Sequence, residues 1–176
     1  MAAAMSREAV LELLHDLAAR LRARDVSVGI RLVGGAALAI AYYDRRATFD
    51  IDAVFSPVEP VLEVVAEIAA EQNLPSDWLN SNAMGYVPFV GPEAWVEVFA
   101  DGDVTVSVAR PEMLLAMKLA ANRGRRDNDD IAALLEICEI TSVEQAQAVY
   151  ESYHAQGVLS RTAVARIEAH LAAQEY

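Results

Sequence analysis

Apolar and polar positions follow two different periods along this chain. In residues 6–24 apolar side chains recur every three or four positions, which predicts an amphipathic helix with Ser6 as its N-cap. Short apolar runs that are rich in β-branched residues or alternate with a period of two predict five strands, at residues 30–35, 49–55, 86–90, 95–100 and 104–109. Helices are predicted between them at residues 36–44 and 57–72, and a loop at residues 73–85.

Helical periodicity takes over after Pro111. Four further helices are predicted, at residues 111–123, 127–138, 142–154 and 160–174. The predicted fold class is therefore α/β, with a mixed sheet of about five strands flanked by helices and a C-terminal helical extension. We expect an α/β core with the N-terminal helix at residues 1–110, and a helical part packed on that core at residues 111–176.

The composition narrows the class of protein. Hydrophobic residues make up 55% of the 176 positions, which is typical of a globular chain and not of a disordered one. No apolar run reaches the roughly 20 residues that span a bilayer, so no membrane partner is expected. The one cysteine, Cys138, cannot form an intramolecular disulfide or, alone, a thiolate zinc cluster. These features predict a cytoplasmic protein.

The net charge of −12 limits the kinds of partner. Proteins that bind nucleic acid usually carry a basic surface that neutralises phosphates. Here the dense basic groups are the cluster Arg123, Arg125 and Arg126 and the pair Arg45–Arg46. A polyanionic partner is therefore expected to bind only locally.

Two short motifs could carry chemistry. Gly34-Gly35 ends a predicted strand at the start of a predicted helix, where backbone N–H groups can approach a phosphate closely. Such a pair can equally be a purely structural turn. Asp50 and Asp52 lie on one face of the next predicted strand, and two like charges there are costly unless a cation compensates them. Mg²⁺ takes one or two carboxylates and leaves positions for triphosphate oxygens, so the two motifs together favour a metal site.

The stretch "VGGAALAIAYYDRRATFDID" resembles the signature of the nucleotidyltransferase superfamily, in which a Gly-Gly or Gly-Ser turn, a helix and Asp-x-Asp on the next strand follow one another. The form "R-x-T-x-D-I-D" resembles the toxin-type branch, which includes abortive-infection nucleotidyltransferases and mycobacterial toxins that modify transfer RNA. A second stretch, "PEMLLAMKLAANRGRRDNDDIAALL", is similar to the C-terminal element of that branch. The resemblance covers about residues 30–138 and implies a nucleotidyltransferase-like fold.

The resemblance also implies roles for individual residues. Gly34 and Gly35 would hold the triphosphate of an NTP, and Asp50 and Asp52 would bind Mg²⁺. Lys118 would contact phosphate oxygens, and Asp127 or Asp130 would be the acidic residue of the helical half. Simpler roles remain open, because Lys118 could be a surface lysine and Asp127 could cap the helix that follows it.

Arg46 and a third carboxylate are further candidates. Arg46 could hold the nucleotide or pair with a nearby carboxylate. Many superfamily members place a third carboxylate on a later strand, where this chain offers Glu97 in "WVEVF" or Asp103 in the turn that follows. We expect Glu97 as the third metal ligand, because it shares a strand face with Trp95 and Phe99. If Glu97 does not reach the site, metal binding weakens and catalysis is slow or lost.

The expected function is therefore Mg²⁺-dependent transfer of a nucleoside monophosphate from an NTP to an acceptor. The resemblance implies a toxin of a toxin–antitoxin pair, with a cognate antitoxin protein as partner and transfer RNA 3′ ends as acceptor. One alternative is a non-catalytic nucleotidyltransferase-like module, such as the antitoxin of a pair. Another is nucleotidylation of a small molecule or a protein, because the sequence does not identify the acceptor.

Overall fold

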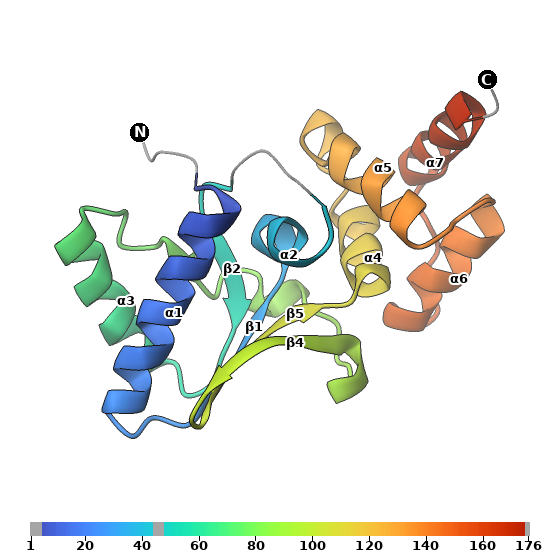
Figure 1. Ribbon diagram of the computed structural model, residues 1–176. Coiled ribbons are helices and arrows are strands. Elements are labelled where there is room, and N and C mark those ends of the chain that lie inside the picture. The colour runs from blue at the N-terminus through green and yellow to red at the C-terminus, as the bar shows by residue number, and fades with distance from the viewer. Residues whose placement is uncertain (1–4, 44–47, 175–176) are drawn as a thin grey trace. The chain divides into compact units, whose positions relative to one another are not determined.

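The computed structural model describes residues 5–43 and 48–174 (Figure 1). The chain divides into two compact units. The first consists of Met1–Gly85 and Trp95–Ala109, and the second of Tyr86–Ala94 and Arg110–Tyr176.

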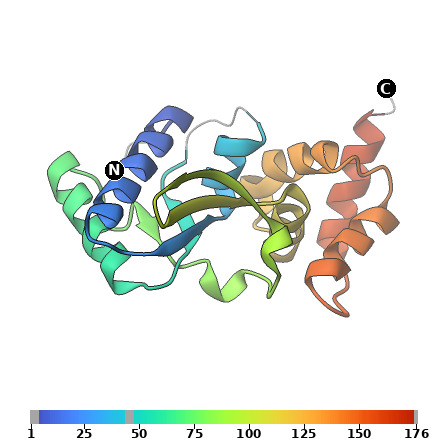
Figure 2. The ribbon, with the colours of Figure 1, turned by 60° about the horizontal axis from the view of Figure 1, so that its bottom comes forward.

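The first unit is built on one five-stranded sheet. Its strands in chain order are β1 (Val28–Leu32), β2 (Ile51–Val54), β3 (Leu79–Asn80), β4 (Trp95–Asp101) and β5 (Val104–Ala109). Their order across the sheet is β3-β2-β1-β5-β4. Strand β1 runs antiparallel to β2 and parallel to β5, so the sheet is mixed. The hairpin of β4 and β5, which Figure 2 shows beside β1, places β4 at the edge of the sheet.

The two faces of this sheet differ in chemistry. Along β1, β2 and β5, buried Val, Ile, Leu and Ala residues alternate with half-buried or exposed positions. The buried face is covered by helices α1 (Arg7–Ala23), α2 (Gly34–Ala41) and α3 (Glu59–Gln72), with α1 packed against α2, α3 and β5 (Figure 1). The opposite face carries the polar residues Arg31, Asp52, Thr105, Ser107 and Glu97. We call it the polar face of the sheet.

The strand predicted at residues 86–90 is wrong. That segment contains the end of a 3₁₀ turn, Met84–Tyr86, and then irregular backbone. Pro88 lacks the N–H that a strand ladder needs, and the side chains of Tyr86 and Phe89 are exposed instead of alternating between two faces. The fifth strand is instead the two-residue β3, which lies inside the predicted loop and pairs in parallel with β2.

The second unit is helical. Its elements are a 3₁₀ turn at Pro92–Ala94, helix α4 (Pro111–Ala121), a 3₁₀ turn at Gly124–Asp127, and helices α5 (Asn128–Ile137), α6 (Val143–Tyr153) and α7 (Arg161–Gln174). Helix α4 packs against α5 and α6, and α7 packs against both of these. The predicted fold class, a mixed sheet of about five strands flanked by helices, is confirmed. Across residues 5–43 and 48–174, no helix is long and apolar enough to cross a membrane.

Candidate active site

The turn from β1 into α2 brings Gly34 next to Asp52. The backbone N–H of Val33 donates to the carbonyl oxygen of Asp52 at 2.9 Å, which holds the end of β1 against β2. Gly34 follows with φ +64°, a left-handed conformation that side chains other than glycine rarely adopt. A Cβ at Gly34 would lie 3.1 Å from Oδ2 of Asp52, so a side chain there would crowd the carboxylate. Glycine at this position therefore allows both the positive φ and the close approach of the Asp52 carboxylate.

The first turn of α2 has features of an anion site. Its N-cap residue is Val33, which has no side chain able to accept from the N–H groups of the first turn, and no acidic residue lies in that turn. The first N–H groups of a helix have no intrahelical partner, and the helix dipole favours negative charge there. Gly34 and Gly35 open this helix and are half-buried. Backbone N–H groups are thus present beside the Asp52 carboxylate.

The two aspartates have different backbone environments. Asp52 lies in β2, half-buried on the polar face, and pairs with Asn80 of β3. Asp50 lies in the bend before β2, because the strand begins at Ile51, two residues later than the predicted start at residue 49. Only Asp52 of the two therefore lies on a strand face. The hydroxyl of Thr48 donates to the carbonyl oxygen of Asp50 at 2.8 Å and fixes this bend.

Arg31, which is not among the residues predicted from the sequence, lies on the same face of the sheet as Asp52. Arg31 pairs with Val54 of β2 and Ser107 of β5. Because Val54 is two residues from Asp52, the Cα atoms of Arg31 and Asp52 are diagonal neighbours about 7–8 Å apart. The signal in the sequence was a charged residue in an otherwise apolar predicted strand, three residues before Gly34.

Trp95 of β4 extends this polar face. The Cζ atom of Arg31 lies 5.5 Å from the centroid of the Trp95 ring, a cation–π contact across β5. The indole N–H of Trp95 is buried and finds no hydrogen-bond partner within the described part of the chain. A buried donor without a partner is costly, and a bound acceptor group would satisfy it.

Glu97 is not brought to Asp52. It lies exposed on edge strand β4, in register with Ser107. Strands β5 and β1 separate β4 from β2, so three strand spacings of about 4.8 Å place Glu97 roughly 14 Å or more from Asp52. On β5, the strand next to β1, the residues on the polar face are Thr105 and Ser107, and neither of them is a carboxylate.

Lys118, Asp127 and Asp130 form a buried ion cluster in the second unit. Nζ of Lys118 lies 2.8 Å from Oδ1 of Asp127 and 2.8 Å from Oδ2 of Asp130. Lys118 is 7% exposed, Asp127 0% and Asp130 2%. The cluster joins α4 to the turn before α5 and to the first turn of α5 itself.

Asp127 does not serve as a helix cap. Its side chain makes no capping bond to α5 and instead accepts from Lys118 and from the backbone N–H of Arg123, the latter at 2.9 Å. Burial alone would raise the pKa of Asp127, but the bonds from Lys118 and Arg123 and their positive charges outweigh it and hold the pKa below its usual range. Asp127 is therefore ionised at neutral pH.

The remaining candidates are placed as follows. Arg46 and its neighbour Arg45 lie outside the described residues. Within residues 5–43 and 48–174, no group of three or more His, Cys, Asp or Glu side chains is arranged to hold a metal ion. The site thus offers Asp52, Asp50 two residues before it in the chain, Arg31 and the first turn of α2, all in the first unit.

Comparison with known proteins gave one family. A family described as "Nucleotidyltransferase of unknown function (DUF6036)" matches residues 8–171. No curated protein and no solved structure matches the chain significantly. The match covers both units, including the polar face of the sheet and the buried ion cluster.

Proposed function

Because the chain belongs to this nucleotidyltransferase family of unknown function, we propose that it transfers a nucleoside monophosphate from an NTP to an acceptor in a Mg²⁺-dependent reaction. The observation that carries the proposal is the approach of Gly34 to Asp52. Backbone N–H groups at the start of α2 and a carboxylate of β2 lie side by side, with only 3.1 Å between the position of a Gly34 Cβ and Oδ2 of Asp52. A triphosphate at this turn would lie next to Asp52.

The residues fit a magnesium–nucleotide complex. Asp50 and Asp52 would hold Mg²⁺, whose bound form neutralises the charge that develops on the phosphates. The N–H groups of the first turn of α2 would bind phosphate oxygens. Two carboxylates are within the number that Mg²⁺ usually takes from a protein when the nucleotide supplies further oxygens. Phosphoryl-type transfer needs mainly this positioning and charge neutralisation.

Arg31 and Trp95 complete the proposed nucleotide site. Arg31 shares the polar face with Asp52 and would donate hydrogen bonds to the triphosphate. Trp95 holds the guanidinium in place by the cation–π contact, and its unpartnered N–H would donate to a ligand oxygen. Arg46, if it matches the superfamily pattern, would add a second cation.

We propose that Lys118 holds the start of α5 in position against α4 and does not contact the phosphates directly. Its Nζ is already bonded to two buried carboxylates, so a contact with phosphate would have to replace one of these ion pairs. Leaving a buried carboxylate unpaired is costly. Asp127 and Asp130 are assigned the same role, because both are directed to Lys118.

For the acceptor we propose the 3′ end of transfer RNA, with the protein acting as the toxin of a toxin–antitoxin pair. The support is the resemblance of the two sequence stretches to toxin-type nucleotidyltransferases. Arg123 and Arg125 are exposed and could contact acceptor phosphates, although Arg123 also pairs with Asp127. The net charge of −12 favours a local contact over a broad basic surface.

The position of Glu97 favours a second candidate, a nucleotidyltransferase-like binding module without transfer activity. A third carboxylate strengthens metal binding in many members of the superfamily, and Glu97 is separated from Asp52 by two strands. Such a module would keep the fold and serve as a partner protein, for example as an antitoxin. It predicts no affinity for Mg²⁺–NTP.

The test is incubation of the purified chain with each α-labelled NTP, Mg²⁺ and total transfer RNA, followed by a denaturing gel. We expect label on RNA with the native chain and none with the double variant Asp50→Asn/Asp52→Asn. The matched control is Asp25→Asn/Asp129→Asn, which removes two exposed carboxylates and should label RNA like the native chain.

The other outcomes discriminate between the candidates. Label on a protein or small molecule but not on RNA would overturn the transfer RNA acceptor and retain the transferase. Full labelling by the Asp50→Asn/Asp52→Asn variant would refute the proposed site. Absence of all labelling together with no Mg²⁺–NTP binding by calorimetry would establish the non-catalytic module.

A further inference from the structure

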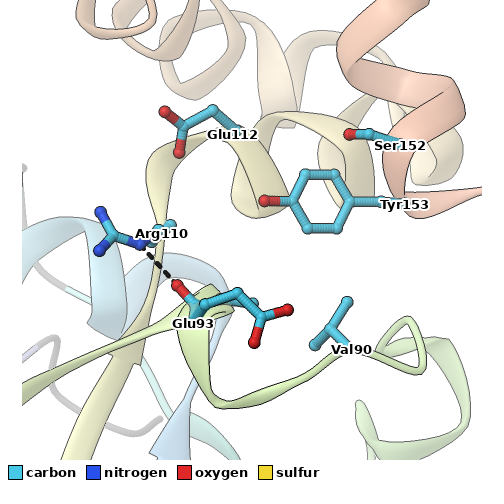
Figure 3. A pocket seen from close by; sticks show the side chains of 7 residues that line it. Val90, Glu93, Arg110, Glu112, Ser152 and Tyr153 are labelled. Atoms are coloured by element: carbon cyan, nitrogen blue, oxygen red, sulfur yellow. Dashed lines mark hydrogen bonds between the residues drawn. The ribbon is translucent and has the colours of Figure 1, made fainter.

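A cavity in the second unit has no role in the proposed transfer reaction. Its volume is about 450 Å³, within the range of small-molecule sites. The lining residues come from the segment before β4, the start of α4 and the end of α6: Val90, Glu93, Ala94, Arg110, Glu112, Ser152 and Tyr153. Figure 3 shows the hydroxyl of Tyr153 directed toward the space that Glu112, Arg110 and Glu93 border.

Glu112 supplies an unused acceptor in this cavity. Its Oε2 atom is buried and has no hydrogen-bond partner within the described part of the chain. An ionised carboxylate oxygen that is shielded from water and unpaired costs free energy, so a donor in the cavity would be stabilising. A first-turn acid of α4 also interacts favourably with the helix dipole, but this interaction does not require the oxygen to be buried and unpaired.

The one positive charge among the lining residues belongs to Arg110. Nε of Arg110 donates to the carbonyl oxygen of Glu93 at 2.7 Å, and the backbone N–H of Arg110 donates to the carbonyl oxygen of Ala94 at 2.9 Å. These bonds tie the arginine to the segment before β4, and Figure 3 shows its guanidinium on the side away from Tyr153. The lining therefore carries two carboxylates, those of Glu93 and Glu112, against one guanidinium that is already hydrogen-bonded to the protein.

The pKa values of two neighbouring groups reflect the burial and the charges around the cavity. Burial raises the pKa of Tyr153, and Glu112 and Glu93 raise it further, against an opposing effect of Arg110. Burial and the charge of Glu112 raise the pKa of Cys138 to about 12. Both groups are thus neutral at physiological pH, and the cavity gains no further negative charge from them.

We propose that this cavity binds a small organic dication, a diamine or an amino-guanidine. Glu112 accepts a hydrogen bond from one cationic end, and Glu93 provides the counter-charge for the other. The Tyr153 ring and the Val90 side chain contact the methylene chain between the two ends. Two carboxylates, an aromatic ring and an aliphatic wall in one cavity match such a ligand in both charge and polarity.

The test is isothermal titration calorimetry of the full chain with putrescine, agmatine and the neutral analogue 1,4-butanediol, in 5 mM Mg²⁺. We expect dissociation constants for a dication between about 10 µM and 1 mM, the range open to so small a ligand, and no measurable heat for the diol. Glu112→Gln removes the charge with little change of shape and should weaken binding at least about tenfold.

Two controls separate this cavity from the rest of the molecule. The first is Glu144→Gln, which changes the second residue of helix α6. Glu112 has the same position in α4, but the Glu144 side chain is exposed, so this variant should bind like the native chain. Asp50→Asn/Asp52→Asn should also bind normally, which distinguishes the cavity from the proposed Mg²⁺ site. If Glu112→Gln does not fold by circular dichroism, Glu93→Gln and Tyr153→Phe take its place.

Three results would overturn the proposal. They are no binding of either dication at millimolar concentration, equal binding by Glu112→Gln and the native chain, and equal binding of 1,4-butanediol. None of them bears on labelling of RNA, so failure here leaves the proposed transferase function untouched.

Discussion

Among single residues, Gly34 matters both for the backbone conformation and for the proposed nucleotide site. Two separate demands fall on this position, a positive φ and the proximity of the Asp52 carboxylate. Gly124 has nearly the same φ, +63°, but nothing lies within 4 Å of the place its Cβ would occupy. The two glycines therefore distinguish backbone strain from crowding of the site.

We predict that Gly34→Ala and Gly124→Ala each lower the free energy of unfolding by about 1–2 kcal/mol, because alanine is strained at positive φ. Only Gly34→Ala should also weaken Mg²⁺–NTP binding, by about tenfold or more, since its methyl group would displace Asp52. Urea denaturation and calorimetry with each variant measure the two effects. Equal loss of nucleotide affinity in both variants would show that the approach to Asp52 has no role.

At the scale of elements, the order of strands decides which carboxylates can act together. Asp52 lies on β2 and Glu97 on β4, with β1 and β5 between them. Side chains on one face of a sheet meet across neighbouring strands and not across three spacings. Membership of the same sheet is therefore not enough to form a metal site.

We therefore expect Glu97 and Asp52 to differ in their effect on nucleotide binding. Glu97→Gln should change the affinity for Mg²⁺–NTP by less than about twofold, whereas Asp52→Asn should lower it by at least about tenfold, the cost of one direct charged ligand. Titration calorimetry in Mg²⁺ gives both values. A large loss in Glu97→Gln would mean that Glu97 contributes to the nucleotide site despite the strand order.

The junction of α4 and α5 depends on the buried ion cluster. Lys118 bonds to Asp127 and Asp130, and breaking such a pair leaves an uncompensated buried charge. The spacing of Lys118, Asp127 and Asp130 along the chain thus has a structural explanation, because it brings two carboxylates near the start of α5 to one lysine of α4.

This cluster should give stability a specific dependence on pH. The pKa of Asp127 is below its ordinary value of 3.8, so its stabilisation is present above about pH 4 and is lost as pH falls through the lower folded-state pKa. We predict that Asp127→Asn destabilises the chain by about 3 kcal/mol at pH 7 and flattens the loss of stability as the pH falls below about 4. Urea midpoints at pH 7 and at several pH values below 4 measure both effects.

The control for this prediction is Asp129→Asn, which changes an exposed acid in the first turn of α5, two residues after Asp127. It should leave the stability at pH 7 within about 0.5 kcal/mol and the acid slope unchanged. If Asp127→Asn retains the native acid slope, Asp127 is not ionised more readily in the folded state and its inferred pairing with Lys118 is wrong.

At the scale of the whole molecule, the two recognised stretches belong to different compact units. The Gly34, Asp50 and Asp52 group lies in the first unit, and the Lys118, Asp127 and Asp130 group in the second. The family match spans both. The net charge of −12 also belongs to this scale, since it limits any RNA contact to a few arginines and is compatible with cationic ligands such as the one proposed for the cavity.

Local pattern was sufficient where a property depends on neighbours in the chain. The apolar repeat of residues 6–24 predicted α1, and the Ser6 side chain indeed accepts from the N–H of Ala9 at 3.2 Å. The four C-terminal helices and the α/β class followed in the same way, because helix period and strand alternation are short-range signals. The Gly34-Gly35 and Asp50/Asp52 motifs could also be selected from spacing alone.

Tertiary structure decided whatever depends on residues distant in the chain. Strand β3 is only two residues long and exists because it pairs with β2, so no local period marks it. The segment 86–90 has strand-like composition but no partner strand, and Pro88 cannot join a ladder. Strand order separates Glu97 from Asp52 and places Arg31 near Asp52. The packing of α4 against α5 buries Lys118 between two carboxylates. Pairing and burial are long-range consequences of packing, which is why the sequence identified the candidate residues but not which of them meet.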